Sequence, residues 1–124
     1  LMAGINHISL NFPLDTIVNN VRYMVRLSKE MAPGCKLYVQ SVLPLNDSLL
    51  AYPKVKGKNP EVRKLNNMLK AMCEEEGVKF LDIASLLSDE KGDLKLLLTK
   101  DGLHIHPQAY QIWAGYLKSN GLLR

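Results

Sequence analysis

Segments typical of β-strands and segments typical of amphipathic helices alternate along this chain, and that order restricts the folds open to it. Two short apolar segments, 36–44 and 78–83, predict strands that are buried on both faces. Apolar residues 1–3 run directly into a Gly-Ile-Asn turn, which predicts the end of a further strand. Helices are predicted at 14–32, 59–76 and 107–121. The alternation predicts an α/β fold in which helices connect the strands of a parallel sheet.

The second predicted helix has a well-defined start and end. Asn59 is the expected N-cap, Pro60 occupies the first turn, and Gly77 is the expected stop. The residues expected to face the core of this helix are Val62, Leu65, Leu69, Met72 and Cys73. Those expected to face the core of the last helix are Ile112, Trp113 and Tyr116.

The composition is that of an ordinary globular protein. A chain of 124 residues with 47% hydrophobic and 23% charged residues predicts a single domain over 1–124. The net charge is +4, but the lysines and arginines are scattered, so the sequence predicts no nucleic-acid partner. No apolar segment approaches the length of a membrane span.

The two cysteines and the N-terminus say little about the compartment. Cys73 falls on the apolar stripe of a helix and Cys35 precedes a strand, so both are expected to be buried free thiols. No segment is typical of a signal peptide, and the chain begins at Leu1 rather than at a methionine. The sequence therefore predicts no particular localisation.

Three polar clusters lie just after predicted strands or just before predicted helices. They are residues 4–7, 44–47 and 101–104. Ligands of open parallel sheets gather at the carboxyl ends of the strands. We therefore expect the first and third clusters to meet at one edge of the sheet.

The third cluster admits three interpretations. Asp101 could accept the Nδ1 proton of His104, which would leave Nε2 free to act as a general base. His104 and His106 could instead bind a metal, with Asp101 or His7 as the third protein ligand. Alternatively, the aspartate forms a turn and a histidine lies at the start of the last helix.

The first cluster admits two interpretations. The amide of Asn6 could donate to a developing oxyanion, with Gly4 permitting a close approach of the backbone. An Asn and a Gly after a strand can also form an ordinary turn.

Together the two clusters resemble the SGNH, or GDSL-type, esterases and acylhydrolases. Their third sequence block reads Gly-x-Asn-Asp, beside "GIN" at 4–6 here, and their fifth reads Asp-x-x-His, beside "DGLH" at 101–104. The segment "VQSVLPLND" at 39–47 is similar to the penultimate strand of bacterial members, especially the carbohydrate acetylesterases. The resemblance spans essentially the whole chain.

The resemblance implies a fold and a chemistry. The fold would be part of a flavodoxin-like, three-layer α/β/α domain with a parallel sheet. His104 would be the general base, Asp101 its orienting partner, and Asn6 with Gly4 the oxyanion side of the site. Family members hydrolyse acyl esters through an acylated serine, without a metal or cofactor. The implied partner is a small-molecule or carbohydrate acyl ester, with acetyl as the expected acyl group.

The chain departs from the family pattern in two places. His7 stands where the family has an aspartate, which puts the turn that presents Asn6 in question. The nucleophile block Gly-Asp-Ser is absent from these residues, because none of the serines follows Gly-Asp. The serines are Ser9, Ser28, Ser41, Ser48, Ser85, Ser88 and Ser119.

These departures predict the C-terminal part of such an esterase, inactive by itself, with N-terminal strands missing. The alternative is a non-catalytic binding module of the same fold. Because missing strands would expose a sheet edge, that module is expected to form a homo-oligomer through the edge.

Overall fold

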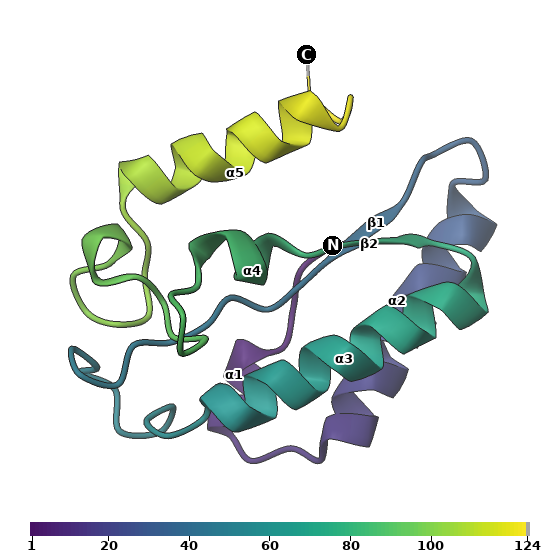
Figure 1. The fold of residues 1–124 in the computed structure, drawn as a ribbon. Helices are drawn as coiled ribbons and strands as arrows, with labels where there is room; N and C mark the ends of the chain where they lie inside the picture. The colour runs from purple at the N-terminus through teal and green to yellow at the C-terminus, as the bar shows by residue number, and fades with distance from the viewer. Residues whose placement is uncertain (124) are drawn as a thin grey trace.

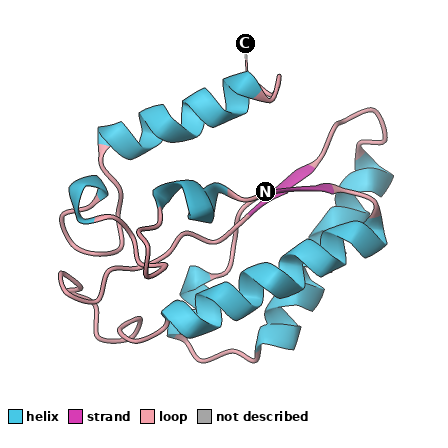
Figure 2. Ribbon diagram, in the orientation of Figure 1, coloured by secondary structure: helices cyan, strands magenta, loops and turns pink. Residues whose placement is uncertain are grey.

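A computed structural model describes residues 1–123 as three layers (Figures 1 and 2). A small parallel sheet lies in the middle, with α2 and α3 packed on one side of it and α4 and α5 on the other, α5 at the top in Figure 1. The helices are α1 (Ile5–Ser9), α2 (Leu14–Met31), α3 (Asn59–Glu76), α4 (Ile83–Leu87), a 3₁₀ turn (Leu96–Leu98) and α5 (Pro107–Ser119). The strands are β1 (Tyr38–Gln40) and β2 (Lys79–Leu81). The predicted α/β fold with a parallel sheet is confirmed.

Both strands are shorter than the sequence predicts. They pair in parallel with Val39 opposite Phe80, and each has three residues. β1 ends because the backbone N–H and C=O of Val42 bond to the side chain of Asn66 rather than to a strand. β2 ends because Asp82 caps a new helix, its carboxylate accepting the N–H of Ser85.

The N-terminal residue bonds to the other side of β1. The terminal amino group of Leu1 donates to the carbonyl of Tyr38, and the carbonyl of Leu1 accepts from the N–H of Gln40, both at 2.8 Å. This is the hydrogen-bond pattern of a parallel pair centred on Val39. Residues 1–3 therefore run beside β1 through the two hydrogen bonds of Leu1, but they are not assigned as a strand of the two-stranded sheet. The predicted turn is wrong, because the residues that follow Gly4 form the short helix α1.

Most of the predicted features of α3 are confirmed. Its five predicted core residues are all buried, and Gly77 ends the helix in the left-handed conformation with φ of 66°. The predicted cap at Asn59 is wrong. The Asn59 amide is buried and bonds both the N–H and the C=O of Leu45, so it fastens the loop after β1 to the start of α3.

The core has two parts, one on each face of the sheet. One lies between the sheet and the helices α2 and α3, and the other between β2, α4 and α5. In α5 the fully buried residue is Ala109, Trp113 and Tyr116 are half-buried, and Ile112 is exposed, so its predicted core position is wrong. Both cysteines are free thiols, but only Cys73 is buried, and Cys35 lies on the surface. Among the described residues, no helix has the length and apolar character needed to cross a bilayer.

Candidate active site

The turn at 99–105 is defined by its own hydrogen bonds. One carboxylate oxygen of Asp101 accepts the backbone N–H groups of Leu103 and His104, at 2.9 and 2.8 Å. The hydroxyl of Thr99 accepts the N–H of Gly102 and donates to the carbonyl of His104, at 3.0 and 2.6 Å. The aspartate is therefore a turn former, as one interpretation expected, and its second oxygen remains available for another partner.

That second oxygen meets the imidazole of His104. Asp101 Oδ2 lies 2.7 Å from His104 Nδ1. The imidazole hydrogen bond is the largest cause that lowers the pKa of the Asp101 carboxyl well below its usual range, and the two backbone N–H groups add to it. Because an ionised carboxylate only accepts hydrogen bonds, the proton of this contact sits on Nδ1. In the neutral imidazole, Nε2 then carries a free lone pair.

Gly102 presses the turn against the loop that follows β1. It has φ of 80°, and its carbonyl accepts the N–H of Asn46 at 2.9 Å. A Cβ atom at this position would overlap the carbonyl oxygen of Asn46 and lie 3.1 Å from the backbone of Leu50. Only glycine satisfies both the conformation and the space. The loop after β1 and the Asp-His turn therefore form one unit.

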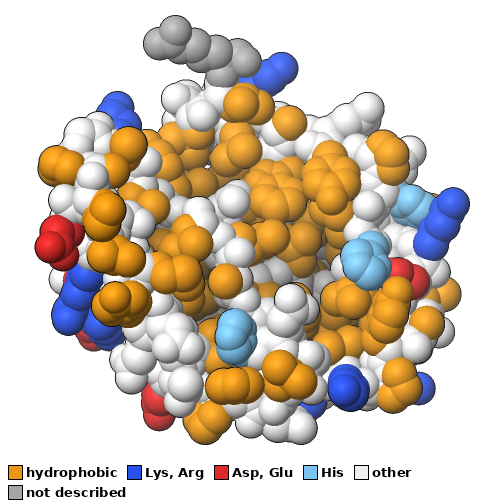
Figure 3. Space-filling view, turned by 180° about the vertical axis from the view of Figure 1, so that it is seen from behind, with side chains coloured by type: hydrophobic (Ala, Val, Ile, Leu, Met, Phe, Trp, Pro, Cys, Tyr) orange, Lys and Arg blue, Asp and Glu red, His pale blue; other side chains and the backbone are white. Residues whose placement is uncertain are grey.

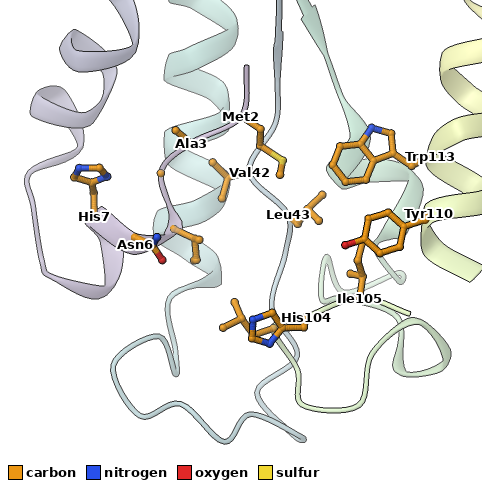
Figure 4. A pocket seen from close by; sticks show the side chains of 13 residues that line it. Met2, Ala3, Asn6, His7, Val42, Leu43, His104, Ile105, Tyr110 and Trp113 are labelled. Carbon is orange, nitrogen blue, oxygen red and sulfur yellow. The ribbon is translucent and has the colours of Figure 1, made fainter. Parts of the chain in front are cut away.

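His104 lies at a pocket of about 440 Å³ between α1 and α5. Figure 3 shows hydrophobic side chains around a hollow on this face of the molecule, and Figure 4 shows Asn6 and Trp113 on opposite sides of the pocket with His104 between them. Within residues 1–123, no Asp, Glu, Lys or Arg lines this pocket, and no Ser or Cys does. The pocket is lined by Met2, Ala3, Gly4, Ile5, Asn6, His7, Val42, Leu43, Leu103, His104, Ile105, Tyr110 and Trp113.

The two predicted clusters therefore meet at one pocket. Gly4 has φ of 146°, and a Cβ there would lie 2.8 Å from Leu65 and 3.0 Å from Val42, so this glycine lets the chain turn tightly from the sheet into α1. The next turn of backbone carries Asn6 to the pocket. Its side chain is exposed and makes no hydrogen bond within residues 1–123.

Comparison with known proteins identifies the family. The model of the GDSL-like Lipase/Acylhydrolase family matches residues 1–112. The chain belongs to this family. A comparison with curated protein sequences found no match.

Solved structures of similar proteins support the same fold. A candidate acylhydrolase from Bacteroides fragilis is 27% identical with a TM-score of 0.80, over 98% of this chain and 60% of that protein. A candidate platelet activating factor from Streptococcus pneumonia is 24% identical with a TM-score of 0.88, over 97% of this chain and 57% of that one. A GDSL-like lipase from Bacteroides thetaiotaomicron is 24% identical with a TM-score of 0.79, over 95% and 58%. The chain thus spans a little under two thirds of the length of these structures.

The family's aspartate position holds His7 here, and α1 accommodates it. The His7 ring packs edge-on against Phe12, with centroids 5.2 Å apart, and also lines the pocket. Asn6 therefore lies in the first turn of the helix α1, and not in the Gly-Ile-Asn turn that the sequence predicts.

His106 has a different place from His104. Its N–H donates to the carbonyl of Leu98 at 2.8 Å and its carbonyl accepts from Ala109 at 3.0 Å, so it leads the backbone into α5. Its side chain is not among those that line the pocket. In the described part of the chain, no group of three or more His, Cys, Asp or Glu side chains is gathered as a metal site would need.

Sequence reasoning missed three aromatic side chains around this site. Trp113 donates its indole N–H to Gln40 at 2.7 Å, which fixes α5 over β1, and Tyr110 stacks on it with centroids 6.1 Å apart. Tyr52 contacts both Asp101 and His104. The periodicity of the last helix predicts that Trp113 faces the core. Tyr52 lies in a loop without periodicity, and nothing in its sequence neighbourhood indicates its contacts.

Proposed function

We propose that this chain carries the acid–base half of a serine acylhydrolase site. His104 is the general base, Asp101 orients it, and Asn6, on the backbone turn made possible by Gly4, donates to the oxyanion. The observation that carries the proposal is the 2.7 Å contact between Asp101 and His104 Nδ1, which leaves Nε2 free beside the pocket that Asn6 lines.

The proposed chemistry balances without a metal or cofactor. His104 Nε2 takes the proton of a serine hydroxyl as its oxygen attacks the ester carbonyl, and the amide of Asn6 donates to the carbonyl oxygen as it becomes negative. The protonated imidazole, stabilised by Asp101, then gives its proton to the departing alkoxide. In the second half of the reaction, His104 takes a proton from water as the water attacks the acyl-serine. The imidazolium then returns the proton to the serine oxygen, and the carboxylic acid is released.

We place the nucleophilic serine outside these 124 residues. Among residues 1–123, no serine lines the pocket of His104. Ser41 is fully buried in the core, where its hydroxyl accepts the N–H of Ala84, and the hydroxyl of Ser9 donates to the backbone of its own helix. This chain alone is therefore expected to lack esterase activity.

The proposed substrate is a neutral acyl ester, with an acetyl ester of a carbohydrate as the specific candidate. The lining of the pocket supports a neutral substrate, because it offers histidines, an amide, apolar side chains and aromatic rings but no charged partner for an acidic or basic group. The choice of a carbohydrate ester rests on the resemblance of residues 39–47 to carbohydrate acetylesterases.

Hydrolysis of an acetyl ester tests this function. The assay compares this chain with a version extended at its N-terminus by a segment that carries a Gly-Asp-Ser block. We expect activity only in the extended protein, with His104→Ala lowering kcat by roughly 10⁴- to 10⁶-fold. His106→Ala is the matched control, since this histidine lies two residues away outside the pocket, and it should keep most of the activity. Full activity of the His104→Ala protein would refute the proposed base.

A second candidate function is that of a non-catalytic module that associates through its sheet edge. One observation favours it. Leu1 directs its N–H and C=O to β1, so the N–H and C=O of Met2 point to the opposite side, and within residues 1–123 neither makes a hydrogen bond.

A further inference from the structure

Tyr52 contacts both members of the Asp-His pair. Its hydroxyl lies 3.4 Å from Asp101 Oδ2, the oxygen that also accepts from His104 Nδ1. Its ring meets the imidazole of His104 edge-to-face, with centroids 5.8 Å apart and planes at 77°. One side chain from a loop that lies far away in the sequence therefore touches the carboxylate and the imidazole at once.

The His104 ring is largely open to solvent. Its side chain is 70% exposed, whereas that of Asp101 is 28% exposed. Among the described residues, Asp101 and Tyr52 are the two whose side chains are recorded in hydrogen-bond or ring contact with this imidazole. An exposed ring held by one hydrogen bond can rotate away from its partner and exchange that bond for water.

The loop that carries Tyr52 is fastened at both ends. Both carboxylate oxygens of Asp47 accept the N–H of Gly57, at 3.0 and 3.1 Å, which closes the loop. Val55 is buried and donates its N–H to the carbonyl of Tyr52 at 3.2 Å. The start of the loop is pressed on Gly102, the residue after Asp101. Tyr52 is therefore presented to the pair by an ordered segment.

We propose that Tyr52 is a positioning residue for the Asp101–His104 pair. The edge-to-face contact with its ring restricts rotation of the imidazole. Its phenol donates to Asp101 Oδ2, so that the carboxylate stays aimed at Nδ1. The consequence is a larger share of the Nδ1–H tautomer, the one that leaves Nε2 free. This role rests on the proposed function, since it matters for catalysis only if His104 is the base.

The tautomer of His104 tests the proposal without any assay of hydrolysis. The ring ¹⁵N chemical shifts of the full chain report the ratio of Nδ1–H to Nε2–H in the neutral imidazole. We expect Tyr52→Ala to lower this ratio about three- to tenfold, the effect of losing one aromatic pair contact. Tyr52→Phe keeps the ring and loses the hydroxyl, so it should restore most of the ratio. Tyr23→Ala, at a tyrosine on α2 that is 67% exposed, is the matched control and should leave it unchanged.

An unchanged ratio in Tyr52→Ala would overturn the proposal, as would the same fall in Tyr23→Ala. If Tyr52→Ala fails to fold, as its amide spectrum would show, Tyr52→Leu serves as a second variant that fills space without an aromatic edge, and an unchanged ratio there has the same meaning. The outcome is separable from that of the esterase assay. A tautomer shift in Tyr52→Ala with no esterase activity in the extended protein would refute the proposed function and support the positioning role of Tyr52. Esterase activity without a tautomer shift would support the function and refute the positioning role.

Discussion

A methyl group added at residue 102 is expected to push the Asp-His turn away from the loop that follows β1. Gly102→Ala forces an alanine into φ of 80° and drives its Cβ into the carbonyl oxygen of Asn46. Strain at such a backbone position costs about 1–3 kcal/mol, and the overlap adds to it. We expect the free energy of unfolding, measured by urea titration, to fall by about 2 kcal/mol or more.

The matched control at the same scale is Gly34→Ala. Nothing lies within 4 Å of the Cβ that this change would add, and Gly34 has no positive φ. The variant should unfold within about 0.5 kcal/mol of the original chain. Equal stability of the two variants would contradict the close packing of the Asp-His turn on the loop after β1.

At the scale of elements, α2 and α3 are joined by an ion-pair cluster at Glu76, which gives the fold a pH dependence. Arg22 and Arg26 of α2 reach the Glu76 carboxylate at the end of α3, at 2.8 and 2.7 Å. Hydrogen bonds from Arg26 and then Arg22 are the largest causes that lower the pKa of Glu76, from 4.5 to about 2. Since the folded pKa is depressed, the stabilisation is fully present above pH 4.5 and is lost as the pH falls towards 2.

Glu76→Gln should therefore lower Tm at neutral pH, and the difference from the original chain should shrink as the pH falls through this range. Thermal unfolding at a series of pH values measures it. Glu74→Gln changes an exposed carboxylate two residues before Glu76; it is the control and should change Tm little at any pH. A Tm difference that is constant from neutral pH to pH 2 would show that the charge of Glu76 does not contribute.

The elements also show what the sequence could predict. The three long helices followed from periodicity and from stops such as Gly77, because these signals are local. The five-residue helices α1 and α4 did not, because they are too short to show a period. Strand lengths did not, because β1 ends where the side chain of Asn66, on a different element, takes over the backbone of Val42. Asn59 was predicted as an N-cap because an asparagine side chain bonds backbone groups. The same property lets its buried amide bond the backbone of Leu45 instead.

For the whole molecule, the order of strands and helices predicted that the clusters at 4–7 and 101–104 would meet. Residues of both clusters line one pocket, and Asp101 contacts the imidazole of His104 there. The Asp-His contact was accessible to sequence reasoning because its partners are three residues apart. Tyr52 was not, because its place depends on how a long loop folds over Gly102.

The open edge at Met2 gives the last prediction, at the scale of the assembled molecule. If two copies pair through this edge, sedimentation velocity should show a dimer that forms as the concentration rises. Met2→Pro removes the outward N–H while Leu1 keeps its bonds to Tyr38 and Gln40, so this variant should stay monomeric. Met2→Ala keeps the N–H and trims the side chain that lines the pocket, so it should still dimerise if backbone pairing drives association. A monomer at every concentration in the original chain would exclude the edge as an interface, and loss of the dimer in Met2→Ala would assign association to the apolar pocket instead.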